Sequence, residues 1–270
     1  LENKYKSRGD VLENIIKRRL TYQPGTEYKY SDLGMILLGT ILERIGGNNL
    51  HALGSEWFYS PLEMKNTFYN PTANQWKNIP PTERTVIPIG TSKTSFMREI
   101  ANLSTSIFGP MKTLSYDLFP KQTAHGYVHD ENANLLGGIS AHAGLFSNAE
   151  DLGKYGQMLL DDGIVGEKKI LDKDLIYSFT SRQSTVNDAN RGYGWDRPDR
   201  DGTSSAGDYF SDKTFGHLGY TGTSFWIDPE QELIIVLLTN RVYPTRENSR
   251  IKHVRRKFHN TLLKSILRFN

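Results

Sequence analysis

Apolar positions in the first fifty residues recur every three or four positions, which is the spacing of an amphipathic helix. Residues 8–20 predict one such helix. Its apolar face carries Val11, Leu12, Ile15, Ile16 and Leu20. Residues 30–47 predict a second helix, which Ser31 or Asp32 can cap and which the glycine pair at 46–47 ends. Because apolar residues cover most of its circumference, this second helix is expected to be buried.

Three later segments also predict helices. Residues 147–163 form the clearest one, in which Ser147 and Glu150 have the spacing of a capping box. Residues 172–181 predict a shorter helix. The segment 249–269 is amphipathic and is expected to lie with its apolar face on a sheet. That face consists of Ile251, Val254, Phe258, Leu262, Ile266 and Phe269.

Strand patterns dominate the last third of the chain. Residues 192–196, 223–229 and 232–240 predict strands, and a short turn at 229–231 joins the last two into an antiparallel hairpin. The run LIIVLL in the last strand is apolar on both faces, which is typical of a strand covered by helices on each side. Residues 70–135 are irregular and are expected to line a site or cover a core.

These patterns predict an α+β fold in one domain, residues 1–270. Residues 1–185 form a region mainly of helices and loops, and residues 186–270 form an antiparallel sheet with a covering C-terminal helix.

The composition of the chain mainly excludes certain kinds of site and partner. The 270 residues include no cysteine, which excludes disulfides, thiolate nucleophiles and cysteine metal ligands. The formal net charge of +3 does not by itself indicate a nucleic-acid or membrane partner. The basic residues of the C-terminal helix lie opposite its apolar stripe, so they are interpreted as a solvated face rather than as a nucleic-acid surface. No apolar run reaches about 18 residues, so no membrane span is predicted.

Two positions could carry chemistry, and each also has a structural interpretation. Tyr30 could act as a general base if nearby cations lowered its pKa. Equally, Ser31 or Asp32 caps the following helix and Tyr30 only packs against it. His217 could hold a proton or bind an anionic group, with Gly219 allowing a ligand close to the backbone. A lone histidine beside a strand is also often structural, and spacing alone leaves both alternatives open.

His125 and His129, which Asp130 and Glu131 follow, form a candidate metal site. A helix would present histidines four residues apart on one face, as zinc requires. The intervening Gly-Tyr-Val disfavours a helix, and no third ligand follows at a recognisable spacing. Phosphate-loop and dinucleotide motifs do not occur either. We therefore expect no metal and no cofactor.

Four blocks of the chain are specific in combination. They are PGTEYKYSDLGMILLGTILERIGG (24–47), PLEMKNT (61–67), HDENANLLGGISAHAGLFSNAEDLGKYGQMLL (129–160) and GHLGYTGTSFWIDPEQELIIVLLTNR (216–241). In this order the blocks resemble the penicillin-recognising serine hydrolases, in the branch of class C β-lactamases, D-alanyl-D-alanine carboxypeptidases and related esterases. The resemblance extends from about residue 8 to residue 265. It implies a β-lactamase/transpeptidase-like fold.

Members of that family use three motifs. A Ser-x-x-Lys motif supplies the nucleophile and an activating lysine, and a Tyr-x-Asn motif supplies a tyrosine that moves protons. By resemblance Tyr30 is this tyrosine, and Asp32 stands where asparagine is usual. The aspartate adds a negative charge, which could pair with the lysine or reduce the affinity for acidic substrates.

The third motif is a Lys-Thr-Gly or His-Thr-Gly triad on a strand. By resemblance it corresponds here to His217, Leu218 and Gly219, and the backbone N–H of Tyr220 would help form an oxyanion hole. Leu218 lacks the hydroxyl that contacts the substrate carboxylate in many members, which weakens the case for β-lactams or D-Ala-D-Ala as substrates. The resemblance also implies that Tyr30 and His217 converge where the helical region meets the sheet.

The nucleophile is the main departure from the family pattern. The family places Ser-x-x-Lys about a hundred residues before the tyrosine motif, and only 29 residues precede Tyr30 here. The one Ser-x-x-Lys in the chain runs from Ser249 to Lys252, on the C-terminal helix and in the wrong order. We therefore expect a nucleophilic serine and the first strands of the sheet upstream of residue 1, and residues 232–240 would otherwise form an uncovered apolar edge.

The expected function is acyl transfer on a cell-wall peptide, amide or ester by a periplasmic, secreted or cell-envelope serine hydrolase. The expected partners are a small or peptidoglycan-derived substrate and the upstream segment of the same protein, without nucleic acid. The alternative is a non-catalytic domain that recognises muropeptides and is fused to a β-N-acetylglucosaminidase-type glycosidase.

Overall fold

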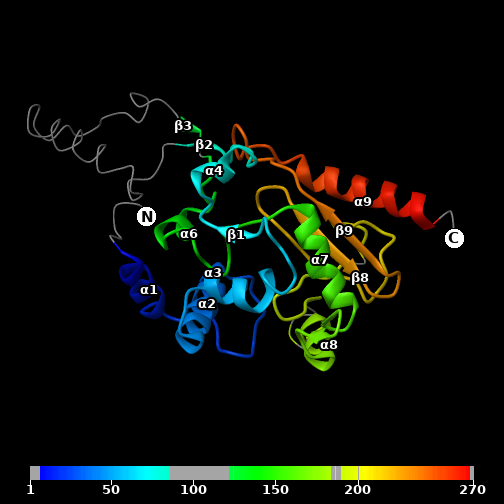
Figure 1. Ribbon diagram of the computed structural model, residues 1–270, viewed down its shortest axis with the longest axis horizontal. Coiled ribbons are helices and arrows are strands. Elements are labelled where there is room, and N and C mark those ends of the chain that lie inside the picture. Colours follow the sequence, from blue (N-terminus) through cyan, green and yellow to red (C-terminus); the bar gives the residue numbers. More distant parts are fainter. Residues whose placement is uncertain are drawn as a thin grey trace, which may run out of the picture.

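The computed structural model describes residues 7–85, 122–123, 125–183, 186, 190–199 and 201–267. Figure 1 shows helices in the N-terminal part of the chain and a sheet that later helices flank. The helices are α1 (Arg8–Ile16), α2 (Asp32–Gly46), α3 (Leu50–Gly54), the π-helical turn η1 (Ser55–Tyr59), α4 (Ala73–Trp76), α6 (Glu131–Leu135), α7 (Ala149–Leu160), α8 (Lys173–Thr180) and α9 (Ile251–Leu267). The strands are β1 (Phe68–Tyr69), β2 (Arg84–Thr85), β3 (Gln122–Thr123), β4 (Leu145–Phe146), β5 (Ile164–Val165), β6 (Lys168–Lys169), β7 (Phe215–Leu218), β8 (Ser224–Asp228) and β9 (Leu233–Leu237).

An antiparallel sheet of order β7-β8-β9 lies in the C-terminal part, and its hairpin β8-β9 confirms the predicted one. The buried carboxylate of Asp228 organises the β8-β9 turn, because it accepts hydrogen bonds from the backbone N–H groups of Glu230 and Gln231, each at 3.1 Å. It also accepts from the N–H and hydroxyl of Ser211 at 2.7 and 2.6 Å. Strands β1-β4, β2-β3 and β5-β6 form three further antiparallel pairs.

Helices cover both faces of this sheet, as the apolar run in β9 predicted (Figure 1). Alternate residues of a strand point to opposite faces. Accordingly, Ile227 and the partly buried Ile234 pack with Met158 of α7. Trp226 and Ile235 instead pack with Leu263 of α9. The α+β prediction is therefore confirmed, and β7 is fixed between two packed layers.

The face that α9 turns to the sheet differs from the predicted one. The buried residues of α9 are Arg255, His259 and Leu263, whereas Val254 and Phe258 are 45% and 36% exposed. The predicted stripe is therefore wrong for these residues, and Phe269 lies outside the described residues. The helix can bury an arginine and a histidine because both find hydrogen-bond partners. His259 donates from Nδ1 to the Ser205 carbonyl at 2.9 Å and accepts from the Ser224 hydroxyl at 3.2 Å.

Helix α2 starts and ends where the sequence predicts. The Ser31 hydroxyl accepts from the N–H of Gly34 at 3.1 Å, and Gly47 ends the helix with φ of +68°. The prediction that α2 is buried is wrong for the described residues, since only Ile36 and Gly39 are buried. Ile36 packs with α1 and Leu136. The opposite apolar side chains of α2 are exposed, namely Met35, Leu38, Ile41, Leu42 and Ile45.

The predicted helix at 172–181 corresponds to α8, and the one at 8–20 to α1, which ends at Ile16. The start of α7 was predicted incorrectly. Asn148, not Ser147, caps it by accepting from the N–H of Asp151 at 2.8 Å. Ser147 instead forms a hydrogen bond with the Thr67 hydroxyl at 2.8 Å.

Candidate active site

Tyr30 lies directly before the N-terminus of α2, where Ser31 caps the helix and Asp32 occupies its first turn. Tyr30 is 61% exposed, so the cap interaction fixes its backbone while its ring remains accessible. Of the two structural roles that the sequence left open, Ser31 fills the cap, whereas Tyr30 is not buried.

His217 reaches the same place from the sheet. It lies in β7 opposite Phe225 of β8, and this ladder fixes the direction of its side chain. The rings of Tyr30 and His217 have centroids 6.4 Å apart and an interplanar angle of 32°. Two residues 187 positions apart in the sequence thus meet where the helical part contacts the sheet, the arrangement that the resemblance implied.

Arg191 completes this group, and the sequence analysis missed it. Its Nη2 donates to His217 Nε2 at 3.0 Å, its Nη1 forms an ion pair with Asp196 at 3.1 Å, and its guanidinium carbon lies 5.6 Å from the centroid of the Tyr30 ring. The only signal in the sequence is a cation just before the Gly-Tyr-Gly turn that begins the predicted strand at 192–196. That segment is not a regular strand: Asp196 forms single bridges with Arg191 and with Gly216 of β7.

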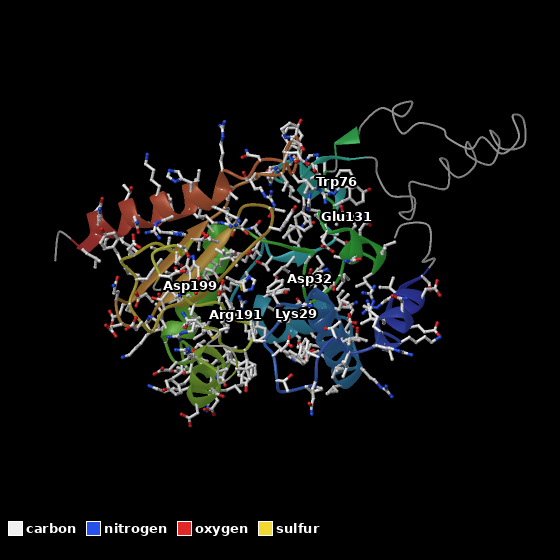
Figure 2. The ribbon with its side chains drawn as sticks, turned by 180° about the vertical axis from the view of Figure 1, so that it is seen from behind. Lys29, Asp32, Trp76, Glu131, Arg191 and Asp199 are labelled. Carbon is white, nitrogen blue, oxygen red and sulfur yellow. The ribbon has the colours of Figure 1, made fainter. Side chains whose placement is uncertain are left out.

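We call the place where Tyr30, Arg191 and His217 meet the junction. Figure 2 shows Arg191 and Asp199 on the side of the sheet and Lys29 and Asp32 at the start of α2. Asp32, Asp196 and Arg191 all act electrostatically on the Tyr30 phenol, so charged side chains from segments far apart in the sequence meet at the junction.

The charges at the junction do not lower the pKa of Tyr30 as the sequence analysis required. Desolvation raises the pKa of the Tyr30 phenol, the Asp32 carboxylate raises it further, and Arg191 lowers it; the net shift is upward from 10.0. Desolvation and the Asp196 carboxylate likewise raise the pKa of Asp199. A further cation would be needed to make Tyr30 a base near neutral pH.

The residues that follow His217 form a tight turn. The Gly219 N–H donates to the Thr223 carbonyl at 2.8 Å, and a Cβ atom on Gly219 would lie 2.1 Å from the Thr223 hydroxyl oxygen. A larger residue at this position would force the Thr223 side chain to move. Leu218 points to the other face of β7 and packs against the cluster under α9. Its role in substrate binding, and that of Gly219, remain predictions.

Tyr220 presents its backbone and its ring to different surroundings. The ring stacks on His129 with centroids 5.5 Å apart, and the Arg241 guanidinium lies 4.0 Å from its centroid on a cation–π contact. Arg241 Nε also donates to the Tyr220 carbonyl at 2.8 Å. Among the described residues, none accepts a hydrogen bond from the Tyr220 N–H. The ring and the carbonyl of Tyr220 are thus held by other residues, and its backbone N–H remains a candidate donor to an oxyanion.

The residues considered for a metal take part in protein hydrogen bonds. His129 Nε2 lies 2.7 Å from Glu83, whose carboxylate also accepts two N–H groups of Arg246, and Arg246 reaches Glu131 at 2.6 Å. His125 Nε2 lies 2.5 Å from the Ile79 carbonyl. Within the described ranges, no group of three or more acidic or histidine side chains is placed to hold a metal ion.

A serine, a histidine and an aspartate also form a hydrogen-bonded row. His142 contacts the Ser140 hydroxyl through Nδ1 and Asp130 through Nε2, both at 2.8 Å. The composition is that of a hydrolytic triad, but Ser140 is 4% exposed and the His142 side chain is 3% exposed. A nucleophile must be reached by its substrate. Asp130 also caps α6, so this row anchors the loop before β4 to that helix.

An α+β fold with Tyr30 at a helix start and His217 on a nearby strand is the arrangement that the resemblance to β-lactamases and penicillin-binding proteins implied. A crystal structure of a penicillin-binding protein homologue from Caulobacter crescentus matches 94% of this chain and 64% of its own, with a TM-score of 0.61 and 14% identity. The family described as Beta-lactamase matches residues 1–259, and the chain belongs to this family.

Two curated relatives are more similar in sequence. One from Escherichia coli (strain K12), named a D-alanyl-D-alanine carboxypeptidase, is 33% identical over 237 residues, which are 87% of this chain and 50% of its own. An N-acetylmuramyl-L-alanine amidase from Bacillus subtilis (strain 168) is 34% identical over 241 residues, 87% of this chain and 49% of its own. The chain therefore spans about half the length of these relatives.

Proposed function

We propose that the chain is part of a serine hydrolase that acts by acyl transfer on an amide, peptide or ester of the cell wall. The nucleophilic serine belongs to a Ser-x-x-Lys segment upstream of residue 1. The observation that supports this function is the junction: in a chain of the β-lactamase family, Tyr30 and His217 meet with ring centroids 6.4 Å apart.

In this proposal, one group on this chain transfers protons and another stabilises the negative charge of the intermediate. The serine hydroxyl attacks the substrate carbonyl, and the Tyr30 phenolate accepts the proton that leaves the hydroxyl. The Tyr220 N–H donates to the oxyanion as the tetrahedral intermediate forms. Tyr30 then gives its proton to the leaving group, and water hydrolyses the acyl-enzyme by the same route in reverse. Because the pKa of Tyr30 is raised on this chain, the lysine of the upstream segment is needed to favour the phenolate.

The names of the relatives favour an amide substrate within this proposal. Both the carboxypeptidase of Escherichia coli and the amidase of Bacillus subtilis are named for amide bonds to alanine. Such substrates occur in peptidoglycan, so the enzyme would work in the cell envelope or outside the cell. None of the helices in the described ranges has the length and apolar composition of a membrane span.

Acylation of the complete protein by a fluorescent penicillin and by a fluorophosphonate probe tests the proposal. We expect labelling of the wild type, and a rate lower by about 10²- to 10⁴-fold for Tyr30→Phe because a general base is lost. Tyr177→Phe is the matched control, since Tyr177 is 74% exposed on α8. A wild type that is neither labelled nor active on peptide, amide or ester substrates would refute the hydrolase. Muropeptide binding without labelling would support the recognition domain instead.

A further inference from the structure

The backbone that carries Arg191 is tied to β7. Asp196 exchanges two hydrogen bonds with Gly216 of β7, at 2.7 and 2.9 Å, and forms a second bridge with Arg191 across a turn in which Gly194 has φ of +75°. The Arg191 side chain is 21% exposed. Its position is therefore set by the same sheet that positions His217, and it does not depend on a loose surface loop.

The hydrogen bonds of His217 define its chemical form. A carbonyl oxygen only accepts, so Nδ1, which lies 2.8 Å from the Leu218 carbonyl, must carry a hydrogen. A guanidinium only donates, so Nε2, which lies 3.0 Å from Arg191 Nη2, must offer its lone pair. One form satisfies both contacts, the neutral imidazole with its hydrogen on Nδ1. A proton on Nε2 would place two donors against each other.

We infer that Arg191 supplies the positive charge of the junction, and that His217 is a positioning residue that holds this charge beside Tyr30 and does not carry a proton. The inference rests on the proposed function and assigns the division of labour within its site. The histidine of the strand triad thus acts together with an arginine from another segment, and the two replace a lysine as the cation on this side of the site.

The surroundings of Tyr30 explain why a cation is needed there. Asp32 and Asp196 carry carboxylates that disfavour a phenolate, and Tyr28 acts in the same direction. Arg191 opposes them. Two contacts orient its guanidinium: the Asp196 carboxylate pairs with Nη1, and His217 Nε2 accepts a hydrogen bond from Nη2. The first consequence is that the hydrogen of the His217 ring has a defined position, on Nδ1. The second consequence is that the pKa of Tyr30, and with it the activity, depends on Arg191.

The first consequence can be measured without any enzymatic activity. Long-range ¹H–¹⁵N spectra of the complete protein labelled on histidine, with His217 assigned from the His217→Gln spectrum, report which ring nitrogen carries the hydrogen. We expect one form at neutral pH, with hydrogen on Nδ1 and Nε2 as an acceptor. A charged ring, or hydrogen on Nε2, would overturn the inference even if the protein proves to be a hydrolase, and the expected form would support it even if no substrate is found.

The second consequence is measured with variants that separate an acceptor from a proton carrier. Glutamine places an amide oxygen near the position of Nε2, so His217→Gln should keep at least about ten times the activity of His217→Leu, which has no acceptor. Arg191→Met should lower the activity by about 10- to 100-fold, which is the effect of one charged hydrogen bond. In the double variant, adding His217→Leu to Arg191→Met should lower the activity little further. Equal losses for the glutamine and leucine variants, or losses that add fully in the double variant, would refute the inference.

A titration of Tyr30 provides the readout that a merely structural role would not change. Arg191→Met should raise the pKa of Tyr30, observed by ¹³C labelling of tyrosine Cζ. Arg256→Met on α9, where Arg256 pairs with Asp208, should leave that pKa unchanged. The alkaline shift needs only a folded protein, so it remains measurable if catalysis is lost. An unchanged Tyr30 titration in a folded Arg191→Met variant would contradict the assignment of Arg191 as the charge of the junction.

Discussion

Two adjacent arginines of α9 allow a sharp test of how the turn after β7 is held. Arg255 is 5% exposed, and its Nη2 donates to the carbonyls of Gly219 and Thr223, both at 2.6 Å. Arg256 instead forms an ion pair with Asp208 at 2.7 Å, with side chains 30% and 41% exposed. The variants Arg255→Ala and Arg256→Ala therefore remove the same side chain from neighbouring positions with very different surroundings.

The magnitude follows from the contacts. Each charged hydrogen bond contributes about 1.5–3 kcal/mol, so the two bonds of Arg255 contribute about 3–6 kcal/mol before desolvation is counted. Burial lowers the pKa of the Arg255 guanidinium, which shows that desolvation opposes its charge. Removing the buried charge recovers part of that cost, and we expect Arg255→Ala to lose about 2–4 kcal/mol of unfolding free energy. Arg256→Ala should lose about 0–1 kcal/mol, as an exposed ion pair does.

Urea unfolding followed by tryptophan fluorescence measures both values, because Trp226 is 1% exposed in the cluster under α9. Arg255→Ala should also lower acylation by the penicillin probe, since the turn carries the Tyr220 N–H. If Arg255→Ala costs no more than Arg256→Ala, the buried guanidinium does not hold the turn and the reasoning fails.

Two further predictions concern packing and pH. Gly216→Ala should destabilise the protein by more than about 2 kcal/mol, because the new Cβ would lie 2.2 Å from the Phe225 carbonyl oxygen. Gly153→Ala on α7 is the control, because a new Cβ there would meet no atom within 4 Å, and it should stabilise the protein by about 0.5–1 kcal/mol. Thermal unfolding measures both effects. Desolvation raises the pKa of Glu83, but hydrogen bonds from Arg246 outweigh it, so the net shift is downward from 4.5. Its contribution is then present above about pH 4.5 and is lost as the pH falls through the lower folded value. Glu83→Gln should therefore be less stable than wild type at pH 7, and the difference should narrow as the pH falls below 4.5; a difference that does not narrow would contradict the assignment.

Local signals in the sequence predicted the helix that follows Tyr30 and the hairpin that pairs with β7, but not β7 itself, which carries His217. A cap at Ser31 and a glycine at position 47 depend only on nearby backbone, so the limits of α2 could be predicted. The β8-β9 hairpin likewise followed from two apolar runs and a short turn. The pairing of Tyr30 with His217 required the family resemblance, because nothing in local spacing relates residues so far apart.

The sequence predictions were wrong or incomplete where contacts with residues distant in the sequence determine the structure. The rotation of α9 is set by carbonyls of the β7-β8 turn that accept from Arg255 and by serines that contact His259, so a stripe of apolar residues predicted the wrong face. Arg191 was missed for the same reason. Its role depends on the bridge between Asp196 and β7, and a single cation before a turn gives no sign of this pairing.

The contacts that hold Tyr30 are separate from those on β7 that hold His217 and Arg191, and this has a consequence for the proposed nucleophile. The cap of α2 holds Tyr30, the β7-β8 ladder holds His217, and the bridge through Asp196 holds Arg191. None of these contacts uses the exposed apolar side of α2. A serine and lysine from outside this chain would therefore meet a half-site that is already formed. Their contribution would be the nucleophile and the second cation that Tyr30 requires, rather than the geometry of the site.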